Sequence, residues 1–421
     1  MLKSCKIAAA TTKNSTFVLN QPPMVVILTN IPTPYRIPLF NRVAAELAAQ
    51  QQRLHVLFAM PTYHRRQWEN VLAEAQFDYT VMNLPALPFS HEHVVAIPQG
   101  FSKKLNALQA KCLVVGGFNL MAMLGARYAL RHRIPYLIWS GETKREASQR
   151  RGRRLRTWLR RPLIQHATGF IAYGTQAQEY LRAFGASQNK IHVAINCVDT
   201  DFFQQHSSGN RRQIRTRTEG QTRLLFVGHL QRRKGLEFLL QALAHCQLQN
   251  VSLDVVGDGP ERDSCQRLAA RLNLSNVRFH GFKQKEDLPK HYAAADVFVF
   301  PSVQEIFGLV MVEAAAAALP IIASEFAGGA HDVVEHGKNG YLVDPTNVAN
   351  LAKYIKELAE DPAKRQRMGE QSFLKVKESV NLQKSSQGFV QAILSCLPGV
   401  FSHTPLPLTS YPLSFRPCGI L

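Results

Sequence analysis

Apolar and polar positions along the chain form two series of short apolar runs, separated by longer stretches of helical composition. Each series contains six runs rich in aliphatic and aromatic residues. The runs cover residues 24–28, 54–58, 112–117, 136–139, 169–173 and 191–194 in the first series, and 223–228, 253–257, 277–281, 297–300, 321–324 and 341–343 in the second. Continuous apolar strands that alternate with helices are typical of parallel sheets covered on both faces. We therefore predict an α/β protein with two Rossmann-like parallel-sheet domains that face each other across a cleft.

A polar stretch separates the two series. Residues 206–222 are rich in Ser, Gly, Asn, Arg and Thr, which is the composition of a linker or a long surface loop. The predicted organisation is a flexible extension at 1–23, an N-terminal domain at 24–205, a linker at 206–222, a C-terminal domain at 223–397 and a Pro-rich tail at 398–421.

The stretch from Pro301 to Pro320 carries two carboxylates around a predicted helix start. A buried strand precedes it, and the segment from Gly308 onward is rich in helix formers. Free backbone N–H groups at Phe307 and Gly308 would favour a phosphate there, with Glu305 before the helix and Glu313 within it. A second interpretation stays open, because Ser302 and Glu305 also fit a capping box and Glu313 an ordinary helix-face charge.

The sequence PSVQEIFGLVMVE in this stretch resembles the signature of the family-4 (group 1) retaining glycosyltransferases, whose fold is GT-B. The resemblance implies that Glu305 contacts hydroxyls of the donor sugar and that Glu313 contacts the ribose. Phe307, Gly308 and Leu309 lie between these carboxylates and would face the donor. The family often has Gly-x-Pro after the helix, where this chain has Ala318 in place of the glycine.

A second loop, from Gly228 to Gly235, follows the first strand of the second series. Its glycines allow a tight turn, and Lys234 offers an ammonium to a phosphate. The family has an Arg after the first glycine and a Lys before the last, which together hold the diphosphate. Lys234 matches the second of these positions, whereas His229 replaces the arginine. Either His229 suffices as the cation, or Arg232 or Arg233 compensates. Further on, Gly281 and Phe282 resemble the segment that reads the base.

Two features of the first half are candidates for the acceptor side, and the first of them resembles the opening element of a subset of the same family. Tyr35 and Arg36 lie in a Pro-rich loop directly after the first strand, where a Tyr would stack on a sugar and an Arg would bind a phosphate. Glu142 ends the fourth strand and would bind the acceptor or act as a general base. The alternatives are a turn that packs Tyr35 on the core and a helix-start role for Glu142.

An arginine-rich segment follows Glu142. Residues 145–161 hold eight arginines and one acid, and Leu155, Trp158 and Leu159 recur at helical spacing. A cationic helix with a narrow apolar stripe would lie on an anionic membrane surface. Equally, the segment could be a solvated helix face with Trp158 in the core.

The composition narrows the classes of partner. The chain has 50 Lys and Arg against 30 acids, a net charge of +20 that favours anionic ligands. Its seven cysteines show no C-x-x-C spacing, which fits a reducing cytosol. No apolar run is long enough to span a membrane or to form a secretory signal. We expect a cytoplasmic protein, with peripheral contact on the cytosolic face of a membrane.

Two short motifs suggest metal ligands but are interpreted otherwise. His91-Glu-His93 has no further ligand nearby that would complete a metal site, and surface histidines are expected. Asp199-Thr-Asp201 spells D-x-D, yet it resembles the Asn-Gly-Val-Asp element that closes the first domain of the family, with Cys197 in place of the glycine. We therefore predict no metal.

Together, these features predict a retaining hexosyltransferase that moves a sugar from a UDP- or GDP-sugar to a glycan or lipid-linked acceptor in polysaccharide biosynthesis. Glu305, Lys234 and Glu142 are the predicted catalytic residues. One alternative is a nucleotide-sugar epimerase of the same fold, and another is a non-catalytic anion- or nucleic-acid-binding protein. Carboxylates beside the phosphate site would repel a polyanion, so no nucleic-acid partner is expected.

Overall fold

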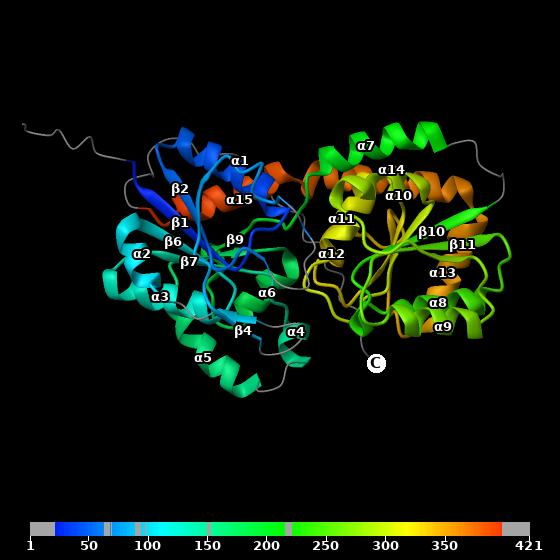
Figure 1. The fold of residues 1–421 in the computed structure, drawn as a ribbon, viewed down its shortest axis with the longest axis horizontal. Helices are drawn as coiled ribbons and strands as arrows, with labels where there is room; N and C mark the ends of the chain where they lie inside the picture. Colours follow the sequence, from blue (N-terminus) through cyan, green and yellow to red (C-terminus); the bar gives the residue numbers. More distant parts are fainter. Residues whose placement is uncertain are drawn as a thin grey trace, which may run out of the picture.

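The computed structural model describes residues 22–62, 68, 70–88, 94–96, 99–149, 153–214 and 221–397. It consists of two lobes side by side, each built on one parallel sheet covered by helices (Figure 1). The predicted fold class is confirmed, and each of the twelve predicted strands is present. The predicted extension and Pro-rich tail fall almost entirely outside the described residues.

The first sheet has seven parallel strands in the order β3-β2-β1-β6-β7-β8-β9. They are β1 Met24–Thr29, β2 Arg53–Phe58, β3 Asp78–Val81, β6 Ala110–Gly116, β7 Tyr136–Ser140, β8 Gly169–Ala172 and β9 Ile191–Val193. A separate antiparallel pair, β4 Ala86–Pro88 and β5 Val94–Ala96, lies between β3 and β6 in the chain. The sequence pattern missed β3 because its Asp78 and Tyr79 are exposed at the sheet edge.

Helices cover both faces of this sheet. They are α1 Arg36–Ala49, α2 Phe101–Leu108, α3 Leu120–His132, α4 Lys144–Gln149, α5 Arg153–His166 and α6 Thr175–Ala183, with a 3-10 turn η1 at Gln188–Lys190. In β1, Val26 and Leu28 face α2 and α3, whereas Val25 and Ile27 face α1. The strand is buried on both sides, which explains its continuous apolar pattern.

The second sheet has six parallel strands in the order β12-β11-β10-β13-β14-β15. They are β10 Thr222–Val227, β11 Val251–Val256, β12 Val277–Phe279, β13 Val297–Phe300, β14 Ile321–Ser324 and β15 Gly340–Val343. The helices that follow β10 are α8 Leu236–Cys246, α9 Arg262–Arg271, α10 Leu288–Ala294, α11 Leu309–Ala316, α12 Ala330–Val333, α13 Val348–Glu360, α14 Pro362–Ser379 and α15 Leu382–Leu394, with 3-10 turns η2 Arg232–Lys234 and η3 Lys285–Asp287.

The predicted linker differs from the structure over its first part. Helix α7, Thr200–Ile214, runs through it and packs against α10 and α11 of the second domain. Its buried residues are Thr200, Phe203 and Ser207, and the other positions whose side chains are described are exposed or half-buried. Because the buried stripe of α7 is narrow, most of its residues are polar, and its composition resembles that of a loop. We propose that the boundary between the domains lies at the start of α7.

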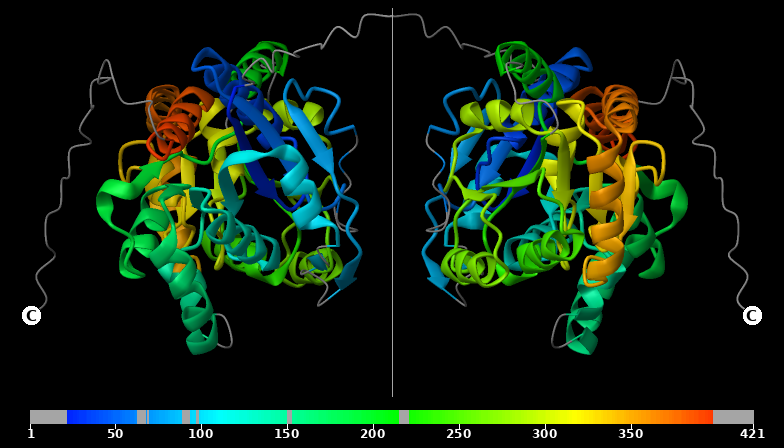
Figure 2. Two further views of the ribbon diagram at one scale, coloured as in Figure 1. Left: turned by 90° about the vertical axis from the view of Figure 1, so that its left-hand side faces the viewer. Right: turned by 90° about the vertical axis from the view of Figure 1, so that its right-hand side faces the viewer.

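The arginine-rich segment forms two helices rather than one, since α4 ends at Gln149 and α5 begins at Arg153. Seen from either end of the molecule, α5 projects beyond the rest of the first domain (Figure 2). Trp158 on this helix is 71% exposed, so the interpretation that placed Trp158 in the core is wrong.

The last helix returns to the first domain. α15 packs against α1, β8 and β9, and Phe389 stacks edge-on against Trp139 at 4.9 Å. Gly388 makes this approach close, because a Cβ at this position would collide with the carbonyl oxygen of Val193.

Replacing Gly388 with Ala should therefore lower the stability of the protein. Gly to Ala inside a helix normally stabilises by about 1 kcal/mol, whereas overpacking against backbone costs typically 1–3 kcal/mol. We expect Gly388→Ala to lower the melting temperature, measured by calorimetry. The control is Gln391→Ala at an exposed position of the same helix, which should change it little. A melting temperature at or above wild type in Gly388→Ala would contradict this packing.

Candidate active site

A cleft of about 350 Å³ opens between the two domains, at the carboxyl ends of the strands of the second sheet. Its first-domain wall includes Tyr35, Trp68 and Asp199. Its second-domain wall comes from the loops after β10, β11, β12 and β13, and includes helix α11. Ligands of open α/β sheets bind at this end of the strands.

Two loops of the second domain are joined at the floor of the cleft. The hydroxyl of Ser302 donates to the backbone oxygen of Arg233 at 3.1 Å, and the N–H of Val303 donates to the same oxygen at 2.9 Å. Ser302 is fully buried. The serine thus ties the loop after β13 to the loop after β10, and the capping-box interpretation is wrong because α11 begins only at Leu309.

This tie brings Glu305 and Lys234 together. The Lys234 Nζ donates to the Glu305 carboxylate, and Nη1 of Arg233 lies 3.7 Å from the same carboxylate oxygen. Glu305 is largely buried, with 16% of its side chain exposed. Burial alone would raise the pKa of the Glu305 carboxyl, but Lys234 and Arg233 outweigh it and hold that pKa below its ordinary value. The carboxylate is therefore charged at neutral pH.

Glu313 lies deeper, in the second turn of α11. The Tyr292 hydroxyl donates to its Oε2 at 2.6 Å. Burial raises the pKa of Glu313 to about 7, although Tyr292 and the Lys285 ammonium lower it in part. The two carboxylates that the sequence paired thus differ electrostatically, since the pKa of Glu305 lies below its ordinary value and that of Glu313 lies above it.

The turn into α11 has a backbone geometry that requires glycine. Gly308 has a φ of +92°, and a Cβ there would lie 2.8 Å from the Phe300 ring. Only glycine fits this position. The side chain of Phe307 is buried and that of Leu309 partly buried, so both would act in the cleft through their backbone.

The remaining predicted donor residues lie around the cleft. Gly228 and His229 line it, and Nδ1 of His229 lies 2.6 Å from the backbone oxygen of Asp258. That nitrogen carries the proton, because a carbonyl oxygen can only accept. Gly281 has a φ of +70°, and the ring of Phe282 lines the cleft with 38% exposure.

On the acceptor side, the structure separates the two residues of the Pro-rich loop. Tyr35 lines the cleft and meets the Trp68 ring edge-on at 6.5 Å. Arg36 instead points under it, donating to Thr29 at 2.7 Å and to the Tyr173 hydroxyl at 2.9 Å, with its guanidinium 4.5 Å from the Trp139 ring. These contacts tie Arg36 to the first sheet. Its guanidinium lies 5.7 Å from the centre of the Tyr35 ring, behind the lining of the cleft rather than in it.

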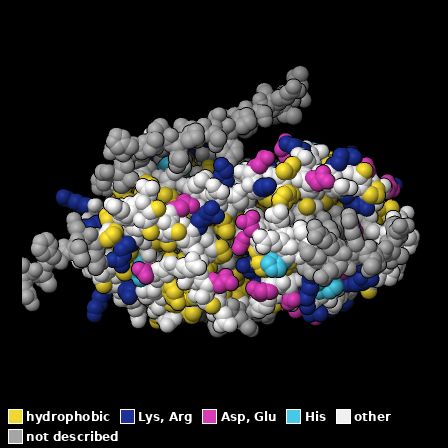
Figure 3. Space-filling view, turned by 90° about the horizontal axis from the view of Figure 1, so that it is seen from above, with side chains coloured by type: hydrophobic (Ala, Val, Ile, Leu, Met, Phe, Trp, Pro, Cys, Tyr) yellow, Lys and Arg dark blue, Asp and Glu magenta, His cyan; other side chains and the backbone are white. Residues whose placement is uncertain are grey.

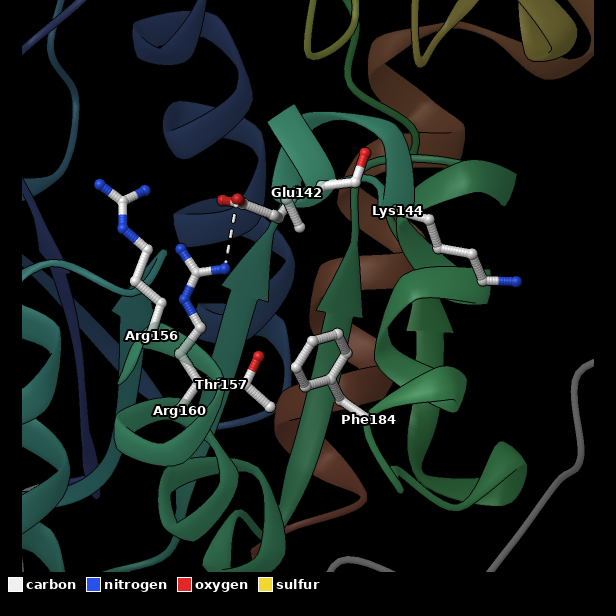
Figure 4. A pocket seen from close by; sticks show the side chains of 8 residues that line it. Glu142, Lys144, Arg156, Thr157, Arg160 and Phe184 are labelled. Carbon is white, nitrogen blue, oxygen red and sulfur yellow. Dashed lines mark ion pairs between the residues drawn. The ribbon is translucent and has the colours of Figure 1, made fainter. Parts of the chain in front are cut away.

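Glu142 is not brought together with Glu305 and Lys234 either. Its carboxylate pairs with Arg160 at 3.2 Å and lines a separate cavity between α4 and α5 (Figure 4). Glu142 precedes α4, whereas Arg160 lies on the next helix, α5. The two residues are therefore too far apart in the sequence for a local pattern to have indicated this pair.

Several residues of the cleft were missed from the sequence. Trp68 faces Tyr35 across the first-domain wall, and Lys283 and Lys285 add two cations beside Phe282. The two lysines could have been predicted from the sequence, because they come just after the segment expected to read the base. No sequence feature indicated Trp68, since the residues around it form no regular apolar pattern.

The suspected metal motifs are accounted for in different ways. His91 and His93 lie outside the described residues. Asp199 accepts a hydrogen bond from the Phe202 N–H at 3.1 Å and so caps α7, in keeping with a structural role. Within the described residues no three His, Cys, Asp or Glu side chains are grouped to hold a metal ion. That the protein needs no metal stays a prediction.

Comparison with known proteins places this chain in a family. The family described as "Glycosyl transferases group 1" matches residues 208–374, and the "Glycosyl transferase 4-like domain" matches residues 40–197. Two parallel α/β sheets with a cleft between them define the GT-B class of proteins, as in HepE of Anabaena, solved in complex with UDP. HepE superposes on this chain with a TM-score of 0.70 at 21% sequence identity. The superposition covers 88% of this chain and 100% of the HepE chain. The chain belongs to the group 1 glycosyltransferases.

Curated relatives are similar over part of their length. A D-inositol 3-phosphate glycosyltransferase of Streptomyces avermitilis is 34% identical over 208 residues, or 46% of this chain and 44% of the relative. A GDP-mannose-dependent alpha-(1-6)-phosphatidylinositol monomannoside mannosyltransferase of Mycolicibacterium smegmatis is 31% identical over 211 residues. These residues are 48% of this chain and 54% of the relative. The chain spans about half the length of the curated relatives it matches.

The raised pKa of Glu313 predicts a pH-dependent stability. A carboxyl whose pKa is about 7 in the folded protein and about 4.3 when unfolded stabilises the fold below pH 4. This contribution is lost as the pH rises to 7, by an amount on the order of 3 kcal/mol. Glu313→Gln has no such group, so its melting temperature should rise relative to wild type between pH 5 and pH 8.

The control for this measurement is Glu335→Gln, which removes an exposed carboxylate paired with Lys338. Its melting temperature should follow that of wild type across the same range. A difference between wild type and Glu313→Gln that is equal at pH 5 and pH 8 would show that Glu313 titrates normally.

Proposed function

We propose that this protein transfers a hexosyl group from a nucleotide-sugar donor to an acceptor hydroxyl, with retention of the anomeric configuration. The observation that carries the proposal is the group of Lys234, Arg233, Glu305 and Glu313 on one wall of the cleft, beside the start of α11. Cations beside a helix start suit a diphosphate, and carboxylates suit hydroxyl groups. HepE, which has the same fold, was solved with UDP and with UDP-glucose.

In the proposed complex, the diphosphate lies against Lys234, Arg233, His229 and the backbone of Gly228. The backbone turn through Phe307, Gly308 and Leu309 approaches it from the other side. Glu305 accepts from hydroxyls of the sugar, Glu313 contacts the ribose, and Gly281 and Phe282 contact the base. The donor is a UDP- or GDP-sugar.

The proposed chemistry places positive charge where negative charge develops. The bond from the anomeric carbon to the diphosphate oxygen breaks, the acceptor oxygen bonds to the same face of that carbon, and the acceptor proton passes to the departing diphosphate. Lys234, Arg233 and the N-terminus of α11 stabilise the leaving group in place of a metal. No carboxylate acts as nucleophile in this scheme.

The acceptor is proposed to enter along the first-domain wall, with a sugar ring against Tyr35 and Trp68, whose edge-to-face rings form an aromatic corner in the cleft. A glycan or a lipid-linked acceptor fits this wall. The mannosyltransferase relative has a lipid-linked acceptor by its name. Arg36 would act through Tyr173 and Trp139 rather than by contact with the acceptor.

We further propose that α5 docks the protein on an anionic membrane surface. Trp158 and Leu159 are exposed on this helix, beside the exposed Arg161. Arg160 is turned inward, so the outer face is less basic than the sequence suggested. No helix among the described residues is long and apolar enough to cross a membrane. Interfacial aromatic and basic side chains would instead hold the protein at the surface.

The donor site is tested by the pair Glu305→Gln and Lys234→Ala. Glu305→Gln should keep UDP affinity but lose transfer, because the carboxylate is assigned to the sugar. Lys234→Ala should weaken UDP binding roughly ten- to hundredfold, the value of one charge-assisted hydrogen bond. Calorimetry with UDP and a transfer assay with UDP-glucose, both in EDTA, measure these effects.

The matched control is Arg232→Ala, which removes an exposed cation of the same loop and should change UDP affinity less than threefold or so. Undiminished transfer by Glu305→Gln would overturn its assignment, and activity that requires manganese would overturn the metal-free scheme.

Membrane docking is tested by co-sedimentation with phosphatidylcholine vesicles, with and without phosphatidylserine. Arg161→Gln should reduce binding to the anionic vesicles about fivefold, since one basic residue contributes about 1 kcal/mol there. Trp158→Ala should reduce the binding that remains at high salt. The control is Leu374→Ala, an equally apolar exposed position on α14, 41% exposed, which should have no effect. Equal binding of all proteins to both kinds of vesicle would exclude docking through α5.

A further inference from the structure

The cavity between α4 and α5 is a second place on the first domain where a ligand fits. It measures about 260 Å³ and shares none of its lining residues with the cleft between the domains. Its floor is the ion pair of Glu142 and Arg160, and its walls include Arg156, Thr157 and Phe184 (Figure 4). The proposed donor and acceptor roles make no use of this space.

The floor of the cavity is rigid and shielded. Arg160 donates to the Tyr180 hydroxyl at 2.6 Å, and its guanidinium lies 4.8 Å from the centre of the Phe118 ring. Only 11% of the Arg160 side chain and 10% of the Glu142 side chain are exposed. A guanidinium held by three neighbours keeps one orientation, so the cavity is already formed before a ligand arrives.

Arg156 gives the cavity an available positive charge. It lies one helical turn before Arg160 on the same face of α5, and both guanidinium groups point toward Glu142 (Figure 4). Within the part of the chain that the structure describes, Arg156 makes no hydrogen bond and no ion pair. Lys144, the other cation of the lining, points away in Figure 4 and pairs with Glu179 at 3.6 Å. Arg156 is therefore free to bind an anion by two parallel hydrogen bonds.

The other walls suit a sugar. The ring of Phe184 is partly buried and faces the same space as the Thr157 hydroxyl (Figure 4). An aromatic face packs against the C–H groups of a pyranose, and a hydroxyl and a carboxylate pair with its hydroxyl groups. The volume is below that of a cavity for a drug-sized molecule, which starts at about 300 Å³, and so fits a single small ring.

We propose that this cavity binds a monosaccharide that carries a phosphate or a carboxylate. The anionic group pairs with Arg156, the ring packs on Phe184, and the ring hydroxyls contact Thr157 and Glu142. The site is also next to the donor loop, because a Cβ on Gly141, the neighbour of Glu142, would lie 2.7 Å from Cγ2 of Ile306, which follows Glu305. The assignment does not depend on sugar transfer being the reaction.

The test is calorimetric titration of the full chain with glucose 6-phosphate, glucuronate, inorganic phosphate and glucose. One equivalent of glucose 6-phosphate or glucuronate should bind, and glucose should not. Arg156→Gln should weaken binding at least tenfold, whereas Arg161→Gln, an exposed arginine on the other side of α5, should leave it unchanged. Phe184→Ala should weaken glucose 6-phosphate more than inorganic phosphate. Saturating UDP should not displace the sugar phosphate.

Three results would overturn the proposal: no binding of either anionic sugar, equal binding by wild type and Arg156→Gln, or displacement of the sugar phosphate by UDP, which would place it in the cleft. If UDP itself fails to bind, the proposed donor site is wrong, but the comparison of Arg156→Gln with Arg161→Gln still decides on this cavity.

Discussion

The buried carboxylate of Glu305 depends on the cations beside it. Taking an ionised carboxylate out of water costs several kcal/mol, and only a close partner with good geometry offsets that cost. Lys234 and Arg233 supply the partner from a different loop, and Ser302 holds that loop in place through its bond to the Arg233 carbonyl. The pair thus keeps the cation proposed to contact the phosphates and the carboxylate proposed to contact the sugar in position. A site arranged in advance loses less free energy to ordering when its ligand binds.

The parts of the fold that depend on local sequence patterns could be predicted from the sequence. A strand buried on both faces shows as an apolar run, and β1 and β13 were found for that reason. The exposed edge strand β3 and the polar helix α7 lack such a run, so they were missed or taken for a linker. The signature residues Glu305 and Glu313 were found because their spacing is local. By contrast, the difference between their pKa values depends on Tyr292, Lys234 and burial.

Contacts between distant parts of the chain explain why two predicted site residues lie elsewhere. Arg36 binds Tyr173, which directly follows β8, and lies against Trp139 on β7. Glu142 binds Arg160, so one of the eight arginines of the basic segment neutralises an internal acid instead of facing solvent. The net charge therefore overstates how basic any one surface is. Seen from above, basic and acidic side chains are interspersed over both domains (Figure 3).

The contacts between the domains differ at the two edges of the molecule. The chain crosses from one domain to the other before α7 and again before α15, both along the upper edge in Figure 1. There α15 is anchored by apolar packing through Phe389. On the side of the loops after β13 and β14, the contacts include polar ones beside the close approach of Ile306 to Gly141. The N–H of Thr175 donates to both carboxylate oxygens of Asp332, at 3.1 and 3.2 Å, and the guanidinium of Arg145 lies 3.5 Å from the centre of the Phe326 ring.

Burial raises the pKa of the Asp332 carboxyl to about 6, although the hydrogen bonds from Thr175 and the charges of His331 and Lys375 lower it in part. Separating domains that meet through polar contacts of this kind costs less free energy than separating an apolar core. Rotation of the domains about the two crossings would therefore open the molecule on the side of Thr175 and Asp332. The loops after β13 and β14 lie on that side, so the contacts that hold the domains together are next to the residues assigned to the donor.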